Sequence, residues 1–210
     1  DLDGFYAFAA SDGKLAPLVQ RFRGLKPPRF PTLFEALVNG IACQQVTLTL
    51  GIRLLNRLAE RFGAAAGEPA VHAFPCPEDL AGEEPEALRQ LGFSRQKARA
   101  LIELGRAVAG GFDLERLAGL DDEAAAGRLR RLRGVGRWTA EYALLRGMGR
   151  THVFPGDDVG ARNHLQNWLE LPGPLDYDGV HRVLQRWQPF GGLVYFHLLL
   201  KRLAEAGYLE

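Results

Sequence analysis

The chain has 210 residues, of which 47% are hydrophobic and 24% charged, and this is ordinary for a soluble globular protein of one large domain or two small ones. Its formal net charge is +1, so a polyanionic partner would have to be recognised by a local cluster of charge. The two cysteines, Cys43 and Cys76, are too few for a disulfide framework or a four-cysteine iron–sulfur cluster. Because the sequence also lacks an apolar run of membrane-spanning length and a secretory signal, we expect a cytoplasmic protein without membrane contact.

Helical periodicity dominates the first half of the chain. Residues 14–23 predict a short helix, and residues 33–45 predict a longer one with Thr32 as its N-cap and Glu35 completing a capping box. Further helices are predicted over residues 50–62, 77–80, 95–110, 113–117 and 121–133.

The helix predicted over residues 95–110 follows Ser94, a natural N-cap, and carries Arg95, Lys97 and Arg99 in its first turn. Positive charge at this end opposes the helix dipole, which indicates contact with phosphate. The indication is modest, because most such side chains are simply solvated.

Residues 128–150 hold the most specific local pattern, with seven arginines and one acid. Gly134-Val135-Gly136 predicts a tight turn between two helices, since glycine permits φ > 0 and leaves room for another molecule. The helix that begins near Arg137 would offer the N–H groups of its first turn to an anion such as a nucleic-acid phosphate. A tight corner with a solvated arginine face has the same spacing, so the turn alone does not decide between the two interpretations.

A pair of carboxylates, Asp157 and Asp158, precedes a helix predicted over residues 159–169. Two more helices are predicted over residues 178–187 and 191–207, and no segment alternates like a strand. The fold class predicted from these patterns is all-α, with roughly ten helices.

Two motifs resemble those of one protein family. Residues 132–140, LRGVGRWTA, resemble the helix-hairpin-helix of the base-excision DNA glycosylase superfamily, and residues 154–160, FPGDDVG, resemble its catalytic loop. Together with Tyr142 they are most similar to the alkylbase branch, the 3-methyladenine type II or AlkA-like enzymes. The resemblance implies two helical lobes with an active-site cleft between them. The lobes would comprise residues 33–145, with the hairpin, and residues 1–32 together with 146–210, with the aspartate loop.

In that family the aspartate matching Asp158 is catalytic. Cleavage of an N-glycosidic bond passes through a sugar with oxocarbenium character, which a carboxylate can stabilise while it orients or deprotonates water. Asp157 is then expected to cap the loop or the following helix. Strand-cutting members of the superfamily carry a lysine two residues after the second hairpin glycine, where this chain has Trp138. We therefore expect a monofunctional glycosylase that leaves an abasic site.

Trp138 and Tyr142 are four residues apart on one helix and match residues that line the family's base pocket, where aromatic rings attract a base made cationic by alkylation. Without the motif, an aromatic pair in the core would be the more common interpretation. Gln45 matches the residue that fills the duplex after a nucleotide is flipped out, although a solvated amide at a helix end is the simpler interpretation. The expected DNA-binding residues are Gln45, Gly134, Val135, Gly136, Arg137 and Thr139.

The chain departs from the family at Gly191 and Leu199, where an arginine and a tryptophan are found in relatives, and this implies a wider, less cation-selective pocket. No cofactor is expected to be required, and no iron–sulfur cluster. The five histidines lack metal-ligand spacing, so no side-chain metal site is expected. The resemblance does imply a monovalent cation, Na⁺ or K⁺, held by main-chain carbonyls near Arg131, Arg133 and Gly136.

The expected partner is double-stranded DNA with damaged bases, bound by a monomer associated with a bacterial nucleoid. Because the net charge is small, binding should involve few phosphate contacts and depend only weakly on salt. Two alternatives stay open: a glycosylase of the same fold for oxidised or mispaired bases, and a non-catalytic protein that binds DNA structure through the hairpin. The second leaves Asp158, Trp138 and Gln45 unexplained.

Overall fold

The computed structural model describes residues 2–67 and 71–209. Over these residues the chain is helical, and its one β feature is an isolated bridge between Ala65 and His72. The chain divides into two compact units, which we call unit 1 (Asp1–Arg29 and Gly149–Glu210) and unit 2 (Phe30–Met148). Of the helices described, none is both long and apolar enough to cross a membrane.

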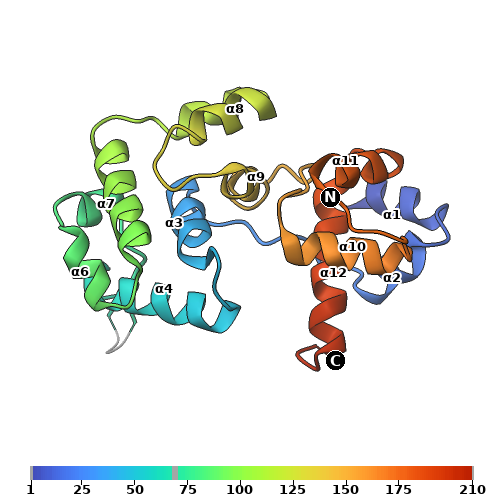
Figure 1. The fold of residues 1–210 in the computed structure, drawn as a ribbon, viewed down its shortest axis with the longest axis horizontal. Helices are drawn as coiled ribbons and strands as arrows, with labels where there is room; N and C mark the ends of the chain where they lie inside the picture. The colour runs from blue at the N-terminus through green and yellow to red at the C-terminus, as the bar shows by residue number, and fades with distance from the viewer. Residues whose placement is uncertain (1, 68–70, 210) are drawn as a thin grey trace. The chain divides into compact units, whose positions relative to one another are not determined.

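Unit 2 is a continuous segment built around two packed helices, α3 and α7. Within it α3 packs against α4, α7 and α9, while α5 and α6 pack against α7 (Figure 1). Leu37, Ile41, Leu101 and Ile102 are fully buried in its core. The elements are α3 (Leu33–Cys43), α4 (Leu48–Phe62), α5 (Pro77–Ala81), α6 (Pro85–Gln90), α7 (Arg95–Ala109), the 3₁₀ helix η1 (Glu115–Gly119), α8 (Asp122–Leu129) and α9 (Arg137–Arg146).

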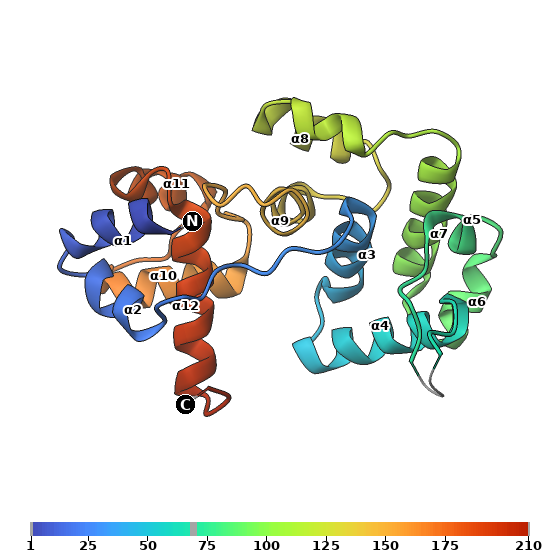
Figure 2. The same cartoon turned by 180° about the vertical axis from the view of Figure 1, so that it is seen from behind.

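Unit 1 joins the two ends of the chain. Helix α12 packs against both α10 and α2, so that segments far apart in sequence lie side by side (Figure 2). The indole N–H of the fully buried Trp187 donates to Asp12 Oδ2 at 2.7 Å, and the ring of Phe5 lies 5.2 Å from that of His197. The elements are α1 (Asp3–Ala10), α2 (Leu15–Arg21), α10 (Val159–Leu169), α11 (Tyr177–Leu184), the 3₁₀ helix η2 (Gln185–Trp187) and α12 (Gly191–Glu205).

Several helix boundaries follow from local capping. Thr32 Oγ1 accepts a hydrogen bond from the Glu35 N–H at 3.1 Å, and Ser94 Oγ accepts one from the Lys97 N–H at 3.3 Å, so both predicted N-caps are confirmed. Helix α10 has the predicted bounds. The all-α prediction is confirmed for the described residues.

Other boundaries differ from the prediction. Helix α3 ends at Cys43, two residues early, because Gln44 has a ψ of 132° that is not helical and Gln45 follows with a left-handed φ of 52°. Helices α1 and α6 were not predicted, and they are only 8 and 6 residues long, too short for a clear period.

Candidate functional site

The two hairpin glycines differ in backbone conformation and in the space around them. Gly134 has φ +79°, and a Cβ at this position would lie 2.6 Å from the Ala100 Cβ, so this glycine serves the turn and its packing. Gly136 has φ −85° and is the N-cap of α9, a position where extended backbone is usual. The expectation of positive φ is therefore correct for Gly134 and wrong for Gly136. A Cβ at Gly136 would meet no atom within 4 Å, so this is the glycine beside which another molecule has room.

The N-terminus of α9 has the properties of an anion site. Gly136 provides no side-chain cap and the first turn contains no acid, an arrangement that favours an external anion. The predicted contacts Arg137 and Val135 differ in placement: Arg137 is exposed, whereas Val135 is 6% exposed and anchors the turn in the core. Thr139 is also buried, at 1% exposed, so its side chain faces the protein interior rather than solvent.

A side chain that the sequence did not single out connects α3 to the hairpin. The amide nitrogen of Gln44 donates to the Gly134 carbonyl at 2.9 Å and to Thr139 Oγ1 at 2.8 Å. The neighbouring Gln45 is exposed and has the left-handed backbone described above. The two adjacent glutamines therefore have different roles: the Gln44 side chain faces inward and bonds the hairpin turn, whereas the Gln45 side chain faces solvent. The pair of glutamines was visible in the sequence, but not which of them points inward.

Lys97 fixes the chain immediately before Gln45. Its ammonium donates to the Ala42 carbonyl at 2.8 Å and to the Gln44 carbonyl at 2.6 Å, two groups that the end of α3 would otherwise leave without a helical partner. Burial lowers the pKa of Lys97 and raises the pKa of the neighbouring Cys43 thiol. The Lys97 ammonium thus bonds main-chain carbonyls within the protein, and the phosphate contact indicated for this helix turn stays a prediction.

The predicted aromatic pair is stacked. The rings of Trp138 and Tyr142 have centroids 5.3 Å apart and an interplanar angle of 25°. The Tyr142 hydroxyl donates to Asn39 Oδ1 at 2.8 Å, which fixes the ring from α3. The guanidinium carbon of Arg146 lies 5.6 Å from the centre of the Tyr142 ring. Both rings are partly exposed, so the pair can offer an aromatic surface to a planar ligand.

In unit 1, Asp158 is the N-cap of α10. Its Oδ1 accepts the Ala161 N–H at 2.9 Å, and its Oδ2 accepts the hydroxyl of Tyr195 at 2.9 Å. The helix-capping role that was expected for Asp157 therefore belongs to Asp158, because the residue immediately before Val159 is the N-cap of α10. Sequence reasoning also missed Tyr195, which lies 37 positions further along the chain, on α12. Only its polarity within an apolar helix could have marked it.

The absence of a side chain at Gly191 does not leave an empty space beside it. A Cβ there would lie 2.8 Å from the His152 carbonyl oxygen, so the glycine lets the start of α12 pack closely on the loop before Asp158. The N–H groups of Gly192 and Leu193 donate to the Thr151 carbonyl at 2.8 and 3.2 Å.

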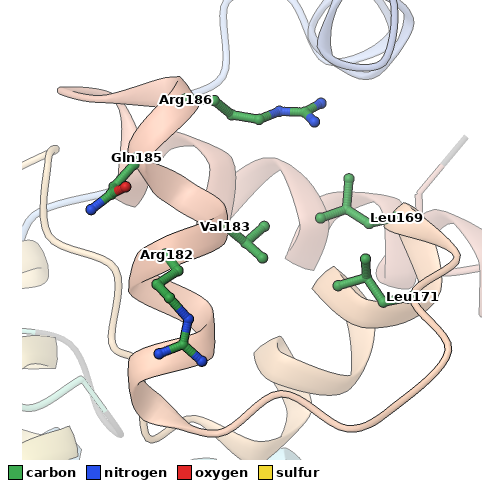
Figure 3. Close-up of a pocket in the computed structure, with 6 residues that line it drawn as sticks. All are labelled: Leu169, Leu171, Arg182, Val183, Gln185 and Arg186. Carbon is green, nitrogen blue, oxygen red and sulfur yellow. The ribbon is translucent and has the colours of Figure 1, made fainter.

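A hollow of about 610 Å³ lies elsewhere in unit 1 and contains none of the predicted site residues. Leu169, Leu171 and Val183 form its apolar part, whereas Gln185 points away from it (Figure 3). Among the described residues, no three histidine, cysteine or carboxylate side chains gather in a way that could hold a metal ion.

Comparison with known proteins places this geometry in context. The sequence pattern described as HhH-GPD superfamily base excision DNA repair protein matches residues 38–190. The chain is 32% identical over 188 residues to DNA-3-methyladenine glycosylase 2 of Escherichia coli K12, covering 89% of this chain and 64% of that protein. It is 29% identical over 201 residues to the DNA-3-methyladenine glycosylase of Bacillus subtilis 168, covering 94% and 66%. The chain thus spans less than two thirds of the length of these curated relatives.

Two solved structures are similar over nearly the whole chain. A 3-methyladenine DNA glycosylase from Archaeoglobus fulgidus superimposes with a TM-score of 0.85 at 27% identity, covering 97% of this chain and 71% of that one. The 3-methyladenine DNA glycosylase of Schizosaccharomyces pombe in complex with abasic DNA gives 0.77 at 26% identity, covering 91% and 92%.

Proposed function

The chain belongs to the HhH-GPD superfamily of base excision DNA repair proteins, and we propose that it is a monofunctional DNA glycosylase that hydrolyses the N-glycosidic bond of flipped-out alkylated bases. The substrate class is supported by the names of the similar proteins from E. coli, B. subtilis, A. fulgidus and S. pombe, all 3-methyladenine glycosylases. The observation that carries the proposal is the fixed carboxylate of Asp158, which is held through both oxygens within the loop that matches the family's catalytic loop.

In the proposed reaction, the Asp158 carboxylate stabilises positive charge as it develops on the sugar and orients the attacking water. A base alkylated on a ring nitrogen is cationic and leaves without a dedicated general acid. The stacked pair of Trp138 and Tyr142 offers such a base an electron-rich surface. Trp138 also occupies the position at which lyases of the superfamily carry lysine, so the proposed product is an intact strand with an abasic site.

In the proposed complex, the N-terminus of α9 binds a phosphate and Gln45 fills the space left by the flipped nucleotide. A monovalent cation could be held by main-chain carbonyls near Arg131, Arg133 and Gly136, and it would supply positive charge between the hairpin and a phosphate. The Gly136 carbonyl accepts the Ala140 N–H at 3.0 Å, and a carbonyl oxygen has a second lone pair, so the hairpin is compatible with such an ion.

The test is single-turnover release of methylated bases from alkylated duplex DNA, with Asp158→Asn and Asp157→Asn compared. Asparagine is as good an N-cap as aspartate, so Asp158→Asn removes charge while it keeps the start of α10. We expect release to fall roughly 100-fold or more in Asp158→Asn, while Asp157→Asn stays close to wild type and the strand stays uncut. A wild-type rate of base release in Asp158→Asn would show that Asp158 is not the catalyst. If the wild-type protein binds DNA but releases no methylated base, the proposed substrate class is wrong and other damaged bases have to be assayed.

A further inference from the structure

We propose that Tyr195 is a positioning residue for Asp158, whose carboxylate it holds in the orientation needed to stabilise the sugar cation and to direct the attacking water. The inference rests on the proposed function, in which Asp158 is the catalytic carboxylate. It is carried by the hydrogen bond of 2.9 Å from the Tyr195 hydroxyl to Asp158 Oδ2, made by a side chain that is only 8% exposed.

The phenol is itself held in place. The ring of Tyr195 packs edge-on against Phe154, with centroids 5.3 Å apart and an interplanar angle of 82°. Phe154 lies in the same loop as Asp158, so the ring that orients the carboxylate also packs against the segment that carries it. The contacts of the Thr151 carbonyl and of Gly191 described above fix the beginning of that loop to the beginning of α12. Tyr195 therefore acts from a rigid support.

The two hydrogen bonds to the carboxylate have different consequences. The bond from the Ala161 N–H to Oδ1 is the ordinary helix cap, and a carboxylate held at one oxygen can still turn about that contact. The second bond, from Tyr195 to Oδ2, fixes the plane of the group. A carboxylate oxygen accepts more than one hydrogen bond, so this bond is compatible with an approach of water to Oδ2.

Charged side chains lie near the same carboxylate. A Cβ at Gly160 would lie 3.3 Å from Asp158 Oδ1 and 3.6 Å from Arg202 Nη1 on α12. His164 lies on α10, and burial together with Arg202 lowers the pKa of this imidazole, which therefore adds little positive charge near neutral pH. Tyr195 is thus a neutral donor that fixes the carboxylate beside charged neighbours.

The first test is Tyr195→Phe, which removes one hydroxyl and keeps the ring against Phe154. Single-turnover release is measured at neutral pH on methylated duplex DNA, with binding to an uncleavable abasic analogue measured in parallel. We expect release to fall roughly tenfold, with DNA affinity and thermal stability unchanged. A merely structural role would lower affinity or stability together with the rate.

Tyr6→Phe is the matched control, because it also removes one tyrosine hydroxyl from unit 1, where Tyr6 accepts the Gly24 N–H at 2.7 Å. It should leave both the release rate and the DNA affinity unchanged. Thermal unfolding of the two variants shows whether either change acts through stability. A wild-type rate in Tyr195→Phe would overturn the inference, as would an equal loss in Tyr6→Phe.

Failure of the inference is distinguishable from failure of the proposed function. If Asp158→Asn is inactive and Tyr195→Phe behaves like wild type, the carboxylate is catalytic but Tyr195 does not position it. If the wild type releases nothing, the proposed function fails, and the bond is tested without activity by carboxyl NMR of ¹³C-aspartate, with Asp158→Asn assigning the resonance. The chemical shift of this carboxyl should change in Tyr195→Phe because the hydrogen bond from the phenol is lost, and an unchanged shift would overturn the inference.

Discussion

The hairpin glycines allow one chemical change to be made at two positions with opposite expected results. Gly134→Ala would place a methyl group 2.6 Å from the Ala100 Cβ and would force an L-residue to adopt a φ of +79°. The left-handed backbone costs about 1–2 kcal/mol, and crowding a packed contact costs about 1–3 kcal/mol. We expect Gly134→Ala to lower the free energy of unfolding by roughly 2–5 kcal/mol, a large share of the roughly 5–15 kcal/mol of a natural domain.

Gly136→Ala is the matched variant. The backbone at Gly136 suits any residue, and the added methyl group would meet no protein atom within 4 Å. Alanine is a poorer N-cap than glycine by about 0.5–1 kcal/mol, but it restricts the unfolded chain by about 0.4–1 kcal/mol in the other direction. Stability should therefore change by less than about 1 kcal/mol. The methyl group stands where the proposed phosphate approaches the start of α9, so DNA binding should weaken.

Thermal unfolding and fluorescence anisotropy with a duplex that contains an abasic analogue measure the two effects. For a chain of this size we expect a fall in Tm of roughly 5–15 °C for Gly134→Ala and almost none for Gly136→Ala. The affinity of Gly136→Ala should fall while its fold is intact. Equal destabilisation by both changes, or wild-type DNA affinity in Gly136→Ala, would refute the assignment of separate roles to the two glycines.

Three further predictions concern stability. Burial lowers the pKa of His197, so below about pH 6.5 the unfolded chain binds a proton that the folded chain excludes. The contribution of His197 to the free energy of unfolding should be constant above that pH and fall below it by up to about 1.4 kcal/mol per pH unit. Urea unfolding at about pH 5.5 and 7.5 measures this dependence, which His197→Gln should flatten. Lys97→Met should cost roughly 1–3 kcal/mol by leaving main-chain carbonyls unbonded, whereas Arg95→Met, an exposed change in the same turn, should cost almost nothing in the same assay. Gln45→Gly should raise stability by up to about 1 kcal/mol through relief of its left-handed backbone, while it weakens binding to abasic duplex in a gel-shift titration.

The features that sequence predicted well are those determined by neighbouring residues. The N-caps Thr32 and Ser94 act on N–H groups three positions away, and the bounds of α10 follow from its apolar period and the acid before it. The turn at Gly134 was predictable for the same reason, because the φ requirement is local.

The features that were missed depend on residues that come together only in the fold. Lys97 reaches carbonyls 53 and 55 positions earlier in the chain, and its position in the first turn of a helix gave no sign of these bonds. Tyr195 meets Asp158 across 37 positions, and no periodicity marks such a pair. The helix cap was assigned to Asp157 although α10 was predicted to begin at Val159, because the expectation reserved Asp158 for catalysis, whereas Asp158 Oδ1 accepts the Ala161 N–H.

The order in which the chain is synthesised gives the two units different histories. Unit 2 is one continuous segment, so all its packing partners are available once residue 148 has been made. The core of unit 1 includes α12. The apolar side chains of α1 and α2, such as Phe5 and Leu15, therefore cannot be fully buried until that helix has been synthesised. The segment proposed to bind DNA can therefore fold before Tyr195 is available to bond the carboxylate of Asp158.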